Sequence, residues 1–100
     1  MTLVAEMVEK EKQRIEFMID EYSKRLVDLP RGTISKIQNG EKNYYYLKYR
    51  EGKKVVTKYI THEEIESLQN EIKERKHIES MVKALKEELK FVNKALGVKI

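Results

Sequence analysis

The chain has 100 residues, of which 38% are charged and 40% are hydrophobic, and its formal net charge is +4. This length predicts one small domain spanning residues 1–100, and the balance of apolar and charged residues argues against wholesale disorder. There is no cysteine, which excludes disulfides and thiolate chemistry. There is also no apolar run of the roughly 18 residues that a membrane span needs, so we expect a cytoplasmic protein without a membrane segment or signal peptide.

The positive charge is concentrated in the middle third of the chain. Residues 1–30 hold 5 Lys/Arg and 7 Asp/Glu, residues 31–60 hold 8 and 2, and residues 61–100 hold 8 and 8. A local excess of cations is more informative than the total, because it predicts a surface that attracts anionic partners.

Residues 3–29 predict a first long helix, so that residues 1–29 form one segment. Apolar residues follow alternating three- and four-residue steps from Val4 through Ile15 to Tyr22, and Ile19 and Leu26 widen the stripe. Pro30 disfavours helical backbone at Leu29 and thereby predicts the end of the helix.

Residues 33–60 predict a β-meander of three antiparallel strands, at about 33–38, 43–50 and 54–60. Asn-Gly at 39–40 and Glu-Gly at 51–52 are turn signals between stretches rich in β-branched and aromatic residues. The second turn has two possible registers. We favour a three-residue loop with a bulge at Gly52, whereas a two-residue loop would exchange the two faces of the third strand.

Residues 61–97 predict a second, longer helix. Thr61 is a suitable N-cap with Glu64 three residues later, and Gly97 is a suitable stop. The apolar spacing slips in phase between Ile72 and Ile78, which predicts a change of winding or of packing partner there. The apolar seam beyond this slip consists of Ile78, Val82, Leu85, Leu89, Val92 and Leu96.

The predicted fold class is therefore α+β, with a long helix, a three-stranded antiparallel meander and a second long helix. Long amphipathic helices are unstable alone in water, so we expect the two to pack as an antiparallel coiled coil. The second helix is the longer one, and its excess near Leu85–Leu96 would need cover from the first helix, from the sheet or from a second copy. A homodimer is the favoured interpretation.

Five of the six tyrosines and five cations fall within residues 43–60. Side chains alternate along a strand, so Tyr45, Leu47 and Tyr49 are expected to face the core. With the three-residue loop, Val55 and Tyr59 join them. The outer face and its turn then carry the predicted partner-binding residues, which are Tyr44, Tyr46, Lys48, Arg50, Lys53, Lys54 and Lys58.

Cations attract phosphates and aromatic rings stack on bases, so this face predicts nucleic-acid binding. The alternative interpretation is structural, because tyrosines pair across strands and edge lysines protect a sheet from aggregation.

The stretch "LPRGTISKIQNGEKNYYYLKYREGKKVVTKYI" resembles a short module of bacterial mobile-element proteins, and it is similar to segments that lead some transposase-like and Fic-type proteins. In strand order it is similar to the arm-binding domains of tyrosine recombinases and to AP2-like domains. The resemblance implies an outer sheet face that contacts DNA, through Tyr44, Tyr46, Lys48, Arg50, Lys54 and Lys58. Those modules have one short helix after the sheet, whereas here a long helix is expected on each side.

We find no sequence pattern of an enzyme, and we expect neither a cofactor nor a metal. Glu74 and His77 form a single Glu-x-x-His step without a second copy, and His62 follows the expected N-cap. There is no phosphate-binding Gly-rich loop.

Three non-enzymatic hypotheses remain. The first is a small basic nucleic-acid-binding protein of phage or mobile-element type, with DNA rather than RNA as the expected partner. The second is an anti-CRISPR-like inhibitor that binds a host nucleic-acid-handling protein. The third is a coiled-coil scaffold or adaptor.

Overall fold

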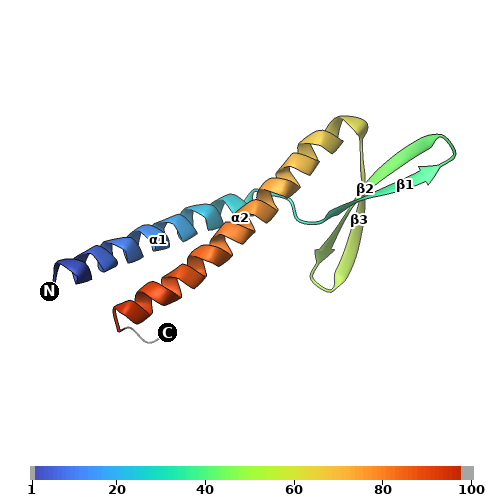
Figure 1. Ribbon diagram of the computed structural model, residues 1–100. Coiled ribbons are helices and arrows are strands. Elements are labelled where there is room, and N and C mark those ends of the chain that lie inside the picture. Colours follow the sequence, from blue (N-terminus) through green and yellow to red (C-terminus); the bar gives the residue numbers. More distant parts are fainter. Residues whose placement is uncertain (1, 98–100) are drawn as a thin grey trace. The chain divides into compact units, whose positions relative to one another are not determined.

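The computed structural model describes residues 2–97, and it has the predicted α+β fold: a helix, a three-stranded antiparallel sheet and a second helix (Figure 1). The chain divides into two compact units. The sheet unit is Leu29–Lys76, and the helical unit combines Met1–Asp28 with His77–Ile100. The second helix contributes its first part to the sheet unit and the remainder to the helical unit.

The first helix, α1, spans Leu3–Val27. It begins where Thr2 caps it, because the Thr2 hydroxyl accepts a hydrogen bond of 3.1 Å from the backbone N–H of Ala5. It ends at Asp28, whose backbone N–H donates to the carbonyl of Arg25 at 3.2 Å. The helix is therefore two residues shorter than predicted at its carboxyl end, with Pro30 following shortly after.

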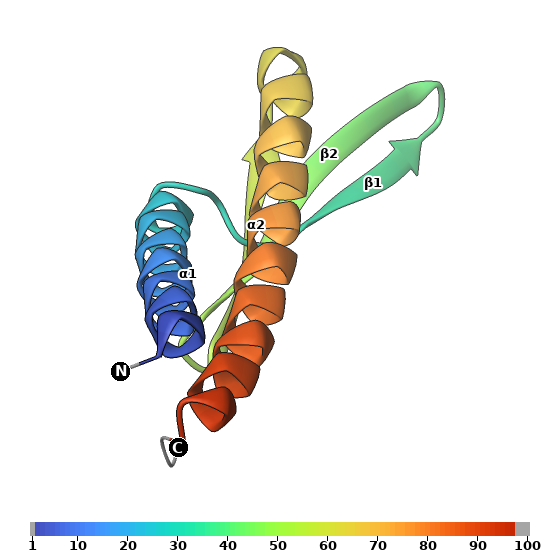
Figure 2. The same ribbon diagram turned by 60° about the vertical axis from the view of Figure 1, so that its left-hand side comes forward.

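In the helical unit, α1 lies beside the carboxyl-terminal part of α2 and runs antiparallel to it (Figures 1 and 2). Ile15 of α1 is completely buried, and Ile78, Val82 and Val92 of α2 are at most 7% exposed. The other seam residues, Leu85, Leu89 and Leu96, are half-buried. The predicted seam thus packs within one chain, while coiled-coil geometry and a homodimer stay predictions.

The second helix, α2, spans His62–Ala95 without interruption. The predicted phase slip coincides with the boundary between the two units, so the helix changes its packing partner there. Leu68, before the slip, lines a groove with Leu47 and Ile60 of the sheet. The expectation that Leu85–Leu96 forms the excess length is therefore wrong, because this part pairs with α1 and the amino-terminal part accompanies the sheet.

Arg75 occupies the phase slip and is the one buried charged residue within residues 2–97. Its guanidinium donates a hydrogen bond of 2.7 Å to the backbone carbonyl of Leu29. This carbonyl follows directly after the end of α1, where helical backbone partners are lacking. At a position where the apolar seam would otherwise continue, Arg75 therefore supplies a hydrogen-bond donor to this carbonyl.

The sheet consists of β1 (Thr33–Asn39), β2 (Lys42–Glu51) and β3 (Lys54–Ile60) in the order β1-β2-β3. Asn39 pairs with Lys42 and Glu51 pairs with Lys54, so each hairpin has a two-residue loop. The predicted three-residue loop with a bulge at Gly52 is wrong. Gly40 and Gly52 stand first in the loops with φ of 66° and 62°, as type II′ turns require, and such turns match the twist of the strands without a bulge.

Candidate nucleic-acid interface

The strand register decides which side chains share a face of the sheet, because directly paired residues of antiparallel strands point the same way. Leu47 and Ile60 are buried at 8% and 3% exposure and define the face that packs against α2. Tyr45 lies on this helix-facing side, and its ring meets that of His62 edge-to-face with 6.2 Å between the ring centroids. Tyr49 is on the same side.

The opposite face of the sheet, termed the outer face, carries the other tyrosines. Tyr44, Tyr46, Lys48 and Arg50 alternate with the helix-facing residues of β2, so their predicted orientation is confirmed. Tyr59 pairs with Tyr46, so it also belongs to the outer face.

Two of the predicted cations are misplaced. Lys58 pairs with Leu47, and Lys54 pairs with Glu51, so both lie on the helix-facing side. Lys53 stands in the loop between β2 and β3. The physical reason is the two-residue loop, since one residue of slip inverts every side chain of β3. Val55 and Tyr59, expected in the core, are 63% and 52% exposed on the outer face.

The aromatic part of the outer face is a cross-strand cluster. The rings of Tyr46 and Tyr59 pack edge-to-face with centroids 5.7 Å apart and an interplanar angle of 69°. Tyr44 is two residues along β2 on the same face and is half-buried. The cluster is flanked by Ile37 on β1, which is 52% exposed. These rings stabilise the sheet by pairing and still present surface to solvent.

The charges of the outer face have one sign. Lys42, Lys48 and Arg50 lie on it and are exposed, and Glu51, the one carboxylate within the three strands, is on the helix-facing side. A hydrophobic and aromatic centre flanked by cations suits contact with an anionic polymer that also offers flat apolar groups.

A hollow of about 530 Å³ adjoins the tyrosine cluster where β3 passes into α2. Tyr44 and Tyr59 line it together with His62. The polar lining comes from the start of β2 and the loop before it, namely Glu41, Lys42 and Asn43. Sequence reasoning missed this hollow because Tyr59 shares a face with Tyr44 only with the two-residue loop.

On the helix-facing side, Lys58 lines a separate groove with Leu47, Ile60 and residues of α2. Three of these α2 residues are acidic, and they are Glu63, Glu64 and Glu71. Three carboxylates in the same groove repel a phosphate, which makes Lys58 a poorer phosphate ligand than the outer cations.

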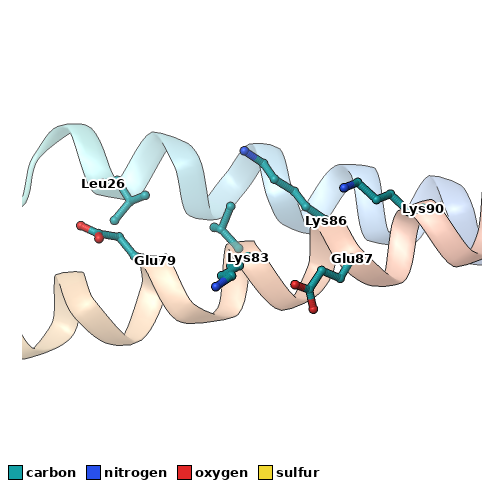
Figure 3. Close-up of a pocket in the computed structure, with 7 residues that line it drawn as sticks. Leu26, Glu79, Lys83, Lys86, Glu87 and Lys90 are labelled. Atoms are coloured by element: carbon teal, nitrogen blue, oxygen red, sulfur yellow. The ribbon is translucent and has the colours of Figure 1, made fainter. Parts of the chain in front are cut away.

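A different groove lies in the helical unit between α1 and α2 (Figure 3). Leu26 and Val82 form its apolar floor, and Lys83, Lys86 and Lys90 line it beside Glu79 and Glu87. Charges of both signs are mixed along this part of α2, as is typical of a solvated helix face.

Exposed ion pairs on α1 shift the pKa values of their members. The guanidinium of Arg14 hydrogen-bonds the carboxylate of Glu11 and lowers the pKa of that group, and Asp20 raises the pKa of Lys24. These pairs are in the helical unit, so they take no part in the chemistry of the outer face.

Residues 2–97 hold no cluster of three or more potential metal-ligating His, Asp or Glu side chains. Over the same residues, no helix has the length and apolarity that crossing a membrane requires.

Comparison with protein families finds a match between residues 5–70 and a domain of unknown function, DUF6788. The match covers about two thirds of the chain, and the chain belongs to this family. It includes α1 from Ala5 onward, the whole sheet and the beginning of α2. No curated protein and no solved structure matches the chain.

Proposed function

We propose that the protein is a non-enzymatic nucleic-acid-binding protein, and that the outer face of its sheet is the contact surface. The observation that carries this proposal is the coexistence of three tyrosines and three uncompensated cations on one open face. The cations bind the phosphates of the nucleic acid, and the tyrosine rings stack on its bases. DNA is the expected partner, and the absence of cysteine suits a cytoplasmic location.

The orientation of the lysines offers a matched test. The double change Lys48→Ala and Arg50→Ala removes two charges from the outer face, while Lys54→Ala and Lys58→Ala removes two from the helix-facing side. Binding to labelled DNA is measured across a salt series for both variants. The outer pair should weaken binding and flatten the dependence of log K on log salt by roughly 1 to 2 in slope.

The control pair should retain an affinity and a salt slope close to those of the unchanged protein, because the charges it removes lie on the helix-facing side. The two variants have equal total charge, so a difference between them reports the position of the charges. Equal losses for both pairs would mean that only net charge attracts DNA and that no face is specific. Unchanged affinity for the outer pair would refute the proposed surface. Melting temperatures confirm that each variant is folded.

A protein partner is a second candidate, favoured by the exposed apolar side chains Ile37 and Val55 on the same face. Such residues suit an inhibitor or adaptor that docks on a nucleic-acid-handling protein. The two candidates separate in a pull-down after nuclease treatment. A single partner that is retained by the unchanged protein and lost with Val55→Asp would favour the protein target.

A further inference from the structure

We infer that the hollow beside the tyrosine cluster holds an unpaired nucleobase, so that the preferred ligand is single-stranded DNA. This inference rests on the proposed function and specifies its ligand. It goes beyond the resemblance to DNA-binding meanders, which implies contact with DNA but not its form.

The composition of the outer face, once the register is corrected, favours stacking over phosphate tracking. Lys54 and Lys58 leave this face and Tyr59 joins it. The face therefore has fewer cations and more exposed ring surface than the sequence predicts. A duplex presents phosphates and groove edges but keeps its base planes stacked inside, whereas a single strand offers both faces of each base.

The hollow is large enough for a base, and its lining combines two tyrosine rings with polar side chains. Its volume of about 530 Å³ lies within the roughly 300–1,000 Å³ that such sites occupy. Tyr44 and Tyr59 supply aromatic surface from two neighbouring strands, and Lys42 stands at the same place for the adjoining phosphate.

Polar groups around the hollow match the edge of a base. The amide of Asn43 offers both a donor and an acceptor, and the carboxylate of Glu41 accepts from exocyclic amino groups. That carboxylate also disfavours a phosphate within the hollow, which leaves the base as the group that enters. His62 is steadied at this position by its ring contact with Tyr45.

The test uses three labelled probes with the whole protein: a mixed-sequence DNA strand, the same strand annealed to its complement, and a strand of equal length with abasic sites. The single strand should bind more tightly than both others. With three outer cations and Lys53 nearby, the salt slope should lie between about −2 and −3, at roughly −0.7 per neutralised phosphate. Tyrosine emission should be quenched on binding, since the chain has no tryptophan.

Tyr59→Ala and Tyr44→Ala should each lower the affinity for the single strand by about 5- to 150-fold, the range of one lost base stack. Tyr59→Phe keeps the ring and should bind like the unchanged protein. Thr57→Ala, on the same face of β3, is the control without a ring. Melting temperatures show which variants are folded, and the abasic probe with the unchanged protein keeps the test decisive if an alanine variant unfolds.

Two results would overturn the inference and leave the proposed function intact. One is a duplex that binds as tightly as the single strand, and the other is an abasic strand that binds as tightly as the normal one. A protein that binds none of the three probes at low salt would refute the proposed function as well.

Discussion

At the scale of single residues, Gly32 shows the strictest backbone requirement in the sheet unit. Its φ is 126°, and a β-carbon placed there would lie 2.4 Å from the backbone carbonyl oxygen of Lys48. This distance is shorter than real β-carbon contacts, and the neighbouring atom is backbone that cannot swing away. Gly32 therefore permits the close passage of the chain from α1 into β1 beside β2.

We expect Gly32→Ala to destabilise the protein by roughly 1–3 kcal/mol from backbone strain, with the steric contact adding to it. Gly97→Ala is the matched control, because Gly97 also has positive φ, 75°, but has open space around it. The control should cost about 1–2 kcal/mol. Urea unfolding measures both, and equal losses would show that the contact with Lys48 contributes nothing.

Arg75 makes a second prediction at this scale. Arg75→Met keeps a long side chain but removes the donor to the Leu29 carbonyl, so an unpaired buried acceptor should cost about 1–3 kcal/mol. Lys76→Met, at the exposed neighbouring position, should change the free energy of unfolding by less than about 0.5 kcal/mol. If both variants unfold at the same urea concentration, the hydrogen bond is not a determinant of stability.

At the scale of elements, much of the architecture was predictable from sequence. The turn glycines, Thr61 before the second helix, and the apolar spacing are local signals, and they gave the order and approximate bounds of all five elements. The faces of β2 followed from alternation alone. The faces of β3 did not, because they depend on the number of loop residues at Gly52, and the sequence Glu-Gly-Lys is compatible with either count.

This sensitivity of β3 to register can be tested by adding charge at adjacent positions. Val55→Lys places a new cation on the outer face, where Val55 is 63% exposed, so it should leave the melting temperature nearly unchanged and strengthen DNA binding at low salt. Val56→Lys should lower the melting temperature, because Val56 is half-buried on the helix-facing side. A reversed pattern would mean that β3 pairs with the other register.

At the scale of the whole molecule, the unequal lengths of the helices have an explanation within one chain. The 34 residues of α2 exceed the 25 residues of α1, so part of α2 has no helical partner within the chain. Sequence periodicity gives the length of the surplus but not which end it occupies, since the choice depends on where the sheet packs. The sheet accompanies the amino-terminal part, as Leu68 and Ile60 show. The length argument for a homodimer consequently loses its basis.

Two substitutions test whether the apolar seam packs within one chain. Ile78→Ala changes a residue that is 5% exposed, and Phe91→Ala changes one that is 74% exposed on the same helix. The first should cost roughly 2–5 kcal/mol and leave the mass in solution unchanged, because the contacts it removes are internal. The second should alter neither quantity. A loss of mass with Phe91→Ala would instead identify an interface between two copies.

Because the outer face belongs wholly to the sheet unit, Ile78→Ala should also bind DNA with unchanged affinity at temperatures below its own melting transition.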